Sequence, residues 1–199
     1  MSRKLVLPLL LVGGLVLLAG CKDDEQSATP APIAGIVESA DLPDAPKQEA
    51  LGEDSIPLNG CHLDGADSLQ DRSDHRHYVQ YKLGDTVVNS YLYTYVNTRK
   101  LNQDWEFLVN GQKRCVGGNA KEPEGSYSLL PDLPANTTGY DAIQRSDSQV
   151  VHTQRAWARK GDKTVVSVEV IRTVDRDGDT QKPPLPVDAK ALTTKVAAE

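Results

Sequence analysis

The sequence predicts an α+β fold, with an antiparallel sheet of about five strands, one main helix and a C-terminal helix packed on the sheet. Two observations support this prediction. Residues 75–96 and 140–174 alternate in the manner of strands, whereas residues 99–115 carry apolar residues at helical spacing. With 39% hydrophobic and 25% charged residues among 199, the composition fits one folded domain with additions at its ends.

The first half of the chain predicts one hairpin followed by the main helix. Residues 35–60 mix a short apolar stretch with prolines, so we expect at most one short helix there. Residues 75–83 and 86–96 alternate on either side of Gly84-Asp85, which offers a tight turn. The helix of residues 99–115 then has an apolar stripe made of Leu101, Trp105, Leu108, Val109 and Cys115.

The second strand of this hairpin has two chemically different faces. One face is aliphatic and carries Val88, Leu92 and Val96. The other face carries Tyr91, Tyr93 and Tyr95. Because the aliphatic face makes the better contact for Trp105 and Leu108, we expect the three tyrosines to be partly solvent-accessible and to form a candidate binding surface. The alternative is that they half-bury against a helix.

The last third predicts three strands and a closing helix. The strands are expected at residues 140–146, 150–160 and 164–174, with a turn at Gly161-Asp162. In the last strand, valines 166, 168, 170 and 174 share one face. Residues 188–198 complete the domain as a helix.

The N-terminus has the layout of an export signal. Arg3 and Lys4 precede an apolar run that is too short to span a membrane, and the run ends in Leu18-Ala19-Gly20-Cys21. This ending resembles the lipobox of bacterial lipoproteins, which implies that Cys21 is acylated and becomes the new N-terminus. The alternative is an ordinary secretory signal with a chance cysteine. We therefore expect a lipoprotein signal peptide at 1–20, a flexible tether at 21–34 and one extracytoplasmic domain at 35–199, anchored to the cell membrane through lipid on Cys21.

The charge balance argues against a nucleic-acid partner. Of 22 Lys and Arg residues, two lie in the first 20 residues, whereas all 28 Asp and Glu residues lie after them. Nucleic-acid affinity comes largely from basic side chains that neutralise phosphates, and no basic run longer than two residues is present. The partners we expect are membrane lipid, through acylated Cys21, and an unknown small ligand or envelope protein.

Export also favours a disulfide between the two remaining cysteines, Cys61 and Cys115. Closing this loop would stabilise the domain by about 4 kcal/mol in the chain-entropy model. The alternatives are two unrelated buried thiols or metal binding, and metal binding is disfavoured because no further ligand has the usual spacing beside either cysteine.

We expect no metal, no cofactor and no catalytic residues. His75 and His77 point the same way on a strand and with His62 or His152 could bind zinc, but their polar surroundings favour plain solvation. Residues 175–186 resemble a calcium loop that lacks its required Gly and Glu. No nucleophile, base and orienting residue form a recognisable set.

Several short motifs, in this order, resemble a known group of proteins. They are Ala40-Asp41-Leu42-Pro43, the pair Cys61 and Cys115, Gly139-Tyr140-Asp141-Ala142, and residues 155–166 with their Arg-Lys-Gly-Asp turn before a valine strand. The order resembles actinobacterial lipoproteins and the extracellular sensor domain of the mycobacterial protein kinase H type, over residues 35–199. The resemblance implies an antiparallel sheet and helices that form a cleft for an unidentified extracellular ligand. Such domains often carry a second disulfide, for which this chain has no cysteines left.

The sequence therefore predicts a membrane-anchored ligand-binding or sensor-type domain without catalytic activity. An extracytoplasmic enzyme and a structural partner in an envelope complex are the alternatives. A pocket that holds a Ser or Asp within hydrogen-bond reach of a His would favour the enzyme. A wide apolar or tyrosine-lined cleft would favour binding, and a large exposed apolar patch would favour the structural partner.

Overall fold

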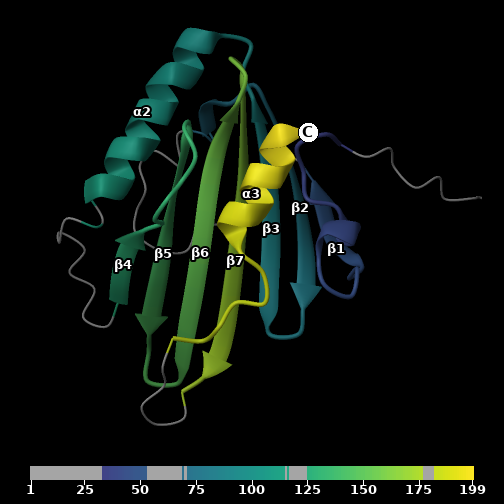
Figure 1. Cartoon of the computed structure of the whole chain (residues 1–199), viewed down its shortest axis with the longest axis vertical. Helices are drawn as coiled ribbons and strands as arrows, with labels where there is room; N and C mark the ends of the chain where they lie inside the picture. Colours follow the sequence, from purple (N-terminus) through teal and green to yellow (C-terminus); the bar gives the residue numbers. More distant parts are fainter. Residues whose placement is uncertain (1–32, 53–68, 70, 115, 117–124, 177–181) are drawn as a thin grey trace, which may run out of the picture. The chain divides into compact units, whose positions relative to one another are not determined.

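The computed structural model describes residues 33–52, 69, 71–114, 116, 125–176 and 182–199. Within them the chain forms a seven-stranded antiparallel sheet in the order β1-β2-β3-β7-β6-β5-β4 (Figure 1). The elements in chain order are η1 (Ser39–Asp41), β1 (Gln48–Gly52), β2 (His75–Leu83), β3 (Thr86–Thr94), α2 (Thr98–Arg114), β4 (Gly125–Leu129), β5 (Thr137–Arg145), β6 (Gln149–Lys160), β7 (Thr164–Asp175) and α3 (Ala189–Ala198).

The α+β class and the antiparallel sheet are confirmed, but the expected number of about five strands is wrong. The two additional strands, β1 and β4, are the five-residue edge strands of the sheet. Neither has the β-branched alternation that identifies the long strands, because an edge strand of this length buries few side chains. All four described residues of β4 other than Tyr127 are exposed.

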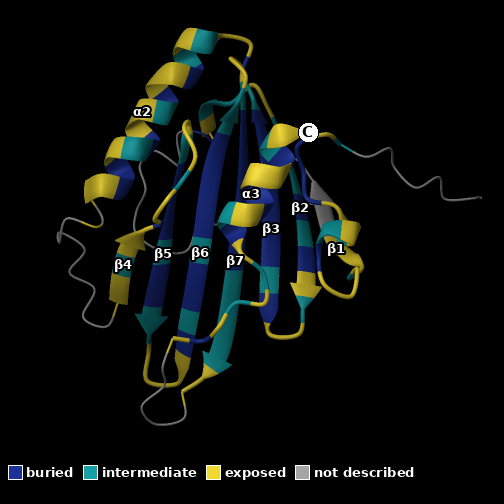
Figure 2. Ribbon diagram, viewed as in Figure 1, coloured by how far each residue is buried: buried dark blue, intermediate teal, exposed yellow. Residues whose placement is uncertain are grey.

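Both faces of the sheet are covered, and each helix belongs to a different face. Leu192 and Val196 of α3 pack in a cluster with Val166, Val168 and Val170 of β7. Leu101 and Leu108 of α2 belong to a second cluster, which contains Val165 and Trp157. Because alternate residues of β7 point to opposite faces, α3 and α2 lie on opposite faces of the sheet. Figure 2 shows the resulting burial along the central strands β3, β7 and β6.

The start of the described domain is bound into the α3 face. Ile36 and Val37 are buried in the aliphatic cluster. The Val37 amide donates to Oγ of Ser90 over 3.0 Å, and the Tyr81 hydroxyl donates to the Val37 carbonyl over 3.0 Å. Two apolar layers therefore enclose the sheet, one formed by α3 and residues 33–42 and the other by α2. Within the described residues, no helix is long and apolar enough to cross a membrane.

Candidate functional site

The tyrosine face does not form the open surface that we expected. Tyr91, Tyr93 and Tyr95 are only 4%, 2% and 0% exposed, so the expectation of solvent-accessible tyrosines is wrong. They pack in one cluster with Leu101 and Leu108 of α2. The aliphatic face of β3 is covered instead by α3 and by residues 33–42. Val96, which was expected on that face, lies beyond the end of β3 and is 68% exposed.

The cause of this error lies in the two faces of β3, which are both apolar enough to be buried. Alternation shows which residues share a face, but not which helix covers that face. The hydroxyl of Tyr95 donates to the carboxylate of Asp104 on α2 over 3.1 Å, and Arg72 pairs with the same carboxylate at 2.9 Å. This buried polar contact holds α2 against the tyrosines.

A row of polar side chains crosses the centre of this face. The strand register places Gln80, Asn89, Glu169 and Arg155 side by side on β2, β3, β7 and β6. Gln80 Nε2 donates to Asn89 Oδ1 over 2.8 Å, and Asn89 Nδ2 donates to Glu169 Oε2 over 3.1 Å. The row ends in an ion pair of 3.5 Å between Glu169 and Arg155, whose side chains are 2% and 1% exposed.

Arg155 is enclosed by aromatic rings. Its Cζ lies 4.8 Å from the ring centroid of Tyr91 and 4.6 Å from that of Trp157, distances typical of cation–π contacts. Burial alone lowers the pKa of Arg155, but the Glu169 carboxylate and the surrounding tyrosines outweigh it and raise that pKa above its usual range. Burial raises the pKa of the Tyr91 and Tyr93 hydroxyls, so both remain neutral donors.

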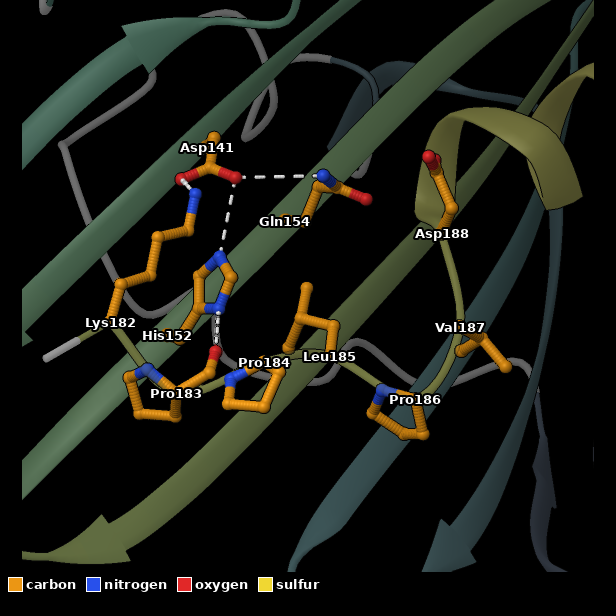
Figure 3. A pocket seen from close by; sticks show the side chains of 10 residues that line it. All are labelled: Asp141, His152, Gln154, Lys182, Pro183, Pro184, Leu185, Pro186, Val187 and Asp188. Carbon is orange, nitrogen blue, oxygen red and sulfur yellow. Dashed lines mark hydrogen bonds and ion pairs between the residues drawn. The ribbon is translucent and has the colours of Figure 1, made fainter.

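A second polar group lies on the α3 face, in a hollow of about 460 Å³ beside the segment of residues 182–188 (Figure 3). Asp141 of β5 pairs with Lys182 at 2.7 Å and with Nε2 of His152 on β6 at 3.2 Å. Nδ1 of His152 lies 2.6 Å from the carbonyl oxygen of Pro183. Burial raises the pKa of Asp141, but the hydrogen bonds from His152 and Lys182 outweigh it and leave that pKa below its usual value.

This hollow meets the criterion set above for an enzyme, because an Asp lies within reach of a His. The pair nevertheless lacks the geometry of a catalytic base. Both ring nitrogens of His152 already face acceptors, Asp141 and the Pro183 carbonyl, so neither is left for a nucleophile or a substrate. The group instead fastens residues 182–184 to the sheet, assisted by Arg172, which donates to the Pro184 carbonyl over 2.6 Å.

The other predicted site residues are either separated or outside the described part of the chain. Cys21, Cys61 and Cys115 lie outside the described residues, as does His62. His75 and His77 are on β2, three strands away from His152 on β6. Within the described ranges, no three His, Cys, Asp or Glu side chains gather as a metal site would require.

Sequence reasoning missed both polar groups, although some signals were present. Glu169 interrupts the valine strand on the face opposite Val168 and Val170, which is an unusual place for a charge. Asp141 and Arg155 lie within two of the motifs that carried the family resemblance. Their roles depend on which residues face each other across β5, β6 and β7, and this register is not visible in the sequence.

Comparisons with known proteins find similarity among solved structures. No family model matches the chain, and no curated protein sequence matches it. Among solved structures, the crystal structure of the extracellular domain of PknH from Mycobacterium tuberculosis is similar to it, at 15% sequence identity and a TM-score of 0.46. The match covers 75% of this chain and 78% of that chain.

Proposed function

We propose that this protein is an extracytoplasmic lipoprotein, anchored through acylated Cys21, whose single domain binds a ligand or an envelope partner without catalysing a reaction. The observation that carries the proposal is the lipobox-like Leu18-Ala19-Gly20-Cys21 after a basic start and a short apolar run. Residues 22–34 are charged and then rich in Ser, Thr, Pro and Ala, a composition suited to a tether. Acyl chains on Cys21 would hold the domain at the membrane surface.

The absence of catalysis is supported by how the ionisable groups in the described core are used. Asp141 is bound to His152 and Lys182, Asp104 to Arg72 and Tyr95, and Glu169 to Arg155. A catalytic acid or base needs an atom within reach of a substrate. The imidazole of His152 is the natural candidate for this role, and both of its nitrogens are engaged with the protein.

Binding is supported by the hollow of about 460 Å³ beside residues 182–188, whose walls combine polar and apolar side chains. The Arg155–Glu169 pair on the other face is too buried to contact a ligand. Replacing a buried ion pair by apolar residues of similar volume is often neutral or stabilising, so we attribute this pair to fixing the arrangement of the central strands.

Metabolic labelling with a fatty-acid probe tests the anchor. Wild-type protein and Cys61→Ala should carry the label, whereas Cys21→Ala should lose it and keep its signal peptide uncleaved. Cys61→Ala is the matched control because it removes a different cysteine of the same chain. Equal label on wild type and Cys21→Ala would refute the lipoprotein assignment. Affinity capture of the detergent-solubilised protein then identifies what it binds.

A further inference from the structure

The segment that borders the hollow on the α3 face has a backbone that accepts hydrogen bonds but can donate few. Pro183, Pro184 and Pro186 have no backbone N–H. Proline also fixes its own φ and confines the residue before it to extended conformations, so residues 182–186 run extended and leave their carbonyls to be bonded from outside. The backbone of this segment is therefore fastened to the sheet by donors that the sheet supplies.

Two side chains of the sheet approach these carbonyls, and they differ in how they respond to pH. Arg172 of β7 donates to the Pro184 carbonyl over 2.6 Å. His152 of β6 has its Nδ1 2.6 Å from the Pro183 carbonyl oxygen (Figure 3). Arginine keeps its charge throughout the physiological pH range, whereas histidine gains and loses a proton between about pH 5 and 8. One of the two attachments is therefore titratable.

The two neighbours of the His152 ring require a proton on each of its nitrogens. While Nδ1 faces the Pro183 carbonyl, Nε2 lies 3.2 Å from Oδ2 of Asp141. A carbonyl oxygen and an ionised carboxylate only accept hydrogen bonds, and a neutral imidazole carries a single N–H. A neutral ring would therefore direct a lone pair at one of these two oxygens. Its side chain is only 4% exposed, so this unfavourable contact is not relieved by water while the structure stays closed.

Charged groups around the ring act in both directions. On the same side of the sheet lie Asp141 and Arg145 of β5, Arg172 of β7, and Lys182 and Asp188 of the bordering segment. The Asp141 carboxylate favours the imidazolium, and the cations oppose it. The two nearest cations are themselves paired, Lys182 with Asp141 and Arg172 with Asp85, which reduces their effect on the ring. The direct interactions that hold the second proton are thus the two contacts of the ring itself.

Loss of the second proton should release Pro183 rather than Asp141. A hydrogen bond to an ionised carboxylate is about twice as strong as one between neutral groups, so the remaining proton should stay on Nε2. The lone pair of Nδ1 would then face the Pro183 carbonyl oxygen across a repulsive 2.6 Å. Leu185 and Val187 pack against the aliphatic cluster, so the resulting shift should be confined to residues 182–184.

We propose that His152 is a pH-dependent latch of the hollow, whose imidazolium holds residues 182–184 on the sheet and whose loss of the Nδ1 proton lets them shift away. This inference rests on the proposed function, since it names the regulation of the hollow that supports binding. The partners of the ring stabilise its charged form, so the contribution of the latch is complete at low pH and is lost as the pH rises. The wall of the hollow formed by residues 182–184 would therefore differ between acidic and alkaline media.

Nitrogen NMR of the histidine ring tests the latch in the wild-type chain. The mature full-length protein, labelled with ¹⁵N, would be studied in detergent at about pH 5.5 and about pH 8.5, on either side of the histidine range. Contacts to Ile143, the register partner of His152 on β5, identify the ring. Both nitrogens should be protonated at the lower pH and Nε2 alone at the higher, and the amide signals of Lys182 and Leu185 should shift with the same midpoint. A neutral ring at the lower pH, a charged ring or a retained Nδ1 proton at the higher, or amide signals that do not follow the ring would overturn the proposal.

Urea unfolding of variants at the same two pH values tests the energetic coupling. The ratio of the unfolding constants of His152→Gln and wild type should fall at least about tenfold from the lower to the higher pH, because the wild type loses the bond that the variant never had. His75→Gln replaces an exposed histidine of β2, and its ratio to wild type should change less than about twofold. A ratio for His152→Gln that is independent of pH would show a purely structural histidine and would overturn the latch. The labelling of Cys21 does not depend on His152, so failure of the latch and failure of the lipoprotein assignment are separate outcomes.

Discussion

Breaking the buried ion pair between Arg155 and Glu169 should destabilise the fold far more than the 3.5 Å distance between Arg155 Nη1 and Glu169 Oε1 would suggest. Arg155→Met leaves the Glu169 carboxylate with Asn89 as its remaining donor, and Glu169→Gln leaves the guanidinium without a counter-charge. Both residues are 1% exposed, so the charge that is left behind is not solvated. Each single variant should lose about 3–5 kcal/mol of unfolding free energy, because an unpaired charge stays buried.

The double variant tests the same reasoning from the other direction. Arg155→Met with Glu169→Gln removes both charges and keeps an acceptor for Asn89, so it should be more stable than the sum of the single losses predicts by at least about 2 kcal/mol. Urea unfolding of all four proteins, followed by circular dichroism, gives this coupling energy.

The control for this experiment is a shorter ion pair at the surface. Arg172 and Asp85 lie 3.0 Å apart, but their side chains are 27% and 45% exposed. Asp85→Asn should cost about 0–1 kcal/mol, because water replaces the lost partner. If Arg155→Met cost no more than Asp85→Asn, or if the coupling were within about 0.5 kcal/mol of zero, burial would not be the determining factor and the argument would fail.

Other substitutions test the rest of the structure. Replacing Tyr91, Tyr93 and Tyr95 together by Ser should destabilise the domain more than Leu92→Ala, which should itself cost about 2–5 kcal/mol of unfolding free energy. Thermal melts in which Leu92→Ala is the less stable variant would indicate that the three tyrosines are solvent-accessible after all. Gly139→Ala should cost about 1–3 kcal/mol in urea unfolding, because its Cβ would lie 2.6 Å from the Arg155 carbonyl oxygen and 2.8 Å from Leu130, whereas no loss would show that β5 shifts freely. The pKa of Asp141 is lowered in the folded state, so the stabilisation that its carboxylate provides is complete above its unfolded pKa of about 3.9 and is lost as the pH falls through the folded value. Asp141→Asn should therefore unfold more easily than wild type at pH 6 and match its stability near pH 2. An equal difference in unfolding free energy at both pH values would contradict the ion-pair network. The bond between Cys61 and Cys115 remains a prediction, and non-reducing peptide mapping that finds two alkylatable thiols in folded protein would refute it.

The long elements could be predicted because each satisfies its own periodicity. The strand expected at residues 75–83 is β2, and the helix expected at 99–115 is Thr98–Arg114. The strand of residues 164–174 also lies within one residue of β7. In these segments local alternation and global burial agree, which is the condition for reading structure from sequence.

The candidate sites could not be predicted, since they depend on register and on the choice of covered face. Asp141 and His152 are 11 residues apart and meet only because β5 and β6 pair with a particular register. Arg155 meets Glu169 for the same reason across β6 and β7. A shift of one residue in either pairing would move the partner to the other face of the sheet. The side chains were visible in the sequence, but their neighbours were not.

The two faces of the sheet differ in the chemistry of their buried side chains. On β7, Val166, Val168 and Val170 give the α3 face an aliphatic core, whereas Ser167 and Glu169 on the same strand give the α2 face its polar groups. Burial of the nearly all-aliphatic cluster on the α3 face, in which Tyr81 is the one aromatic residue among those described, contributes hydrophobic stabilisation. The α3 face also holds residues 33–42, through Val37 and its bonds to Ser90 and Tyr81.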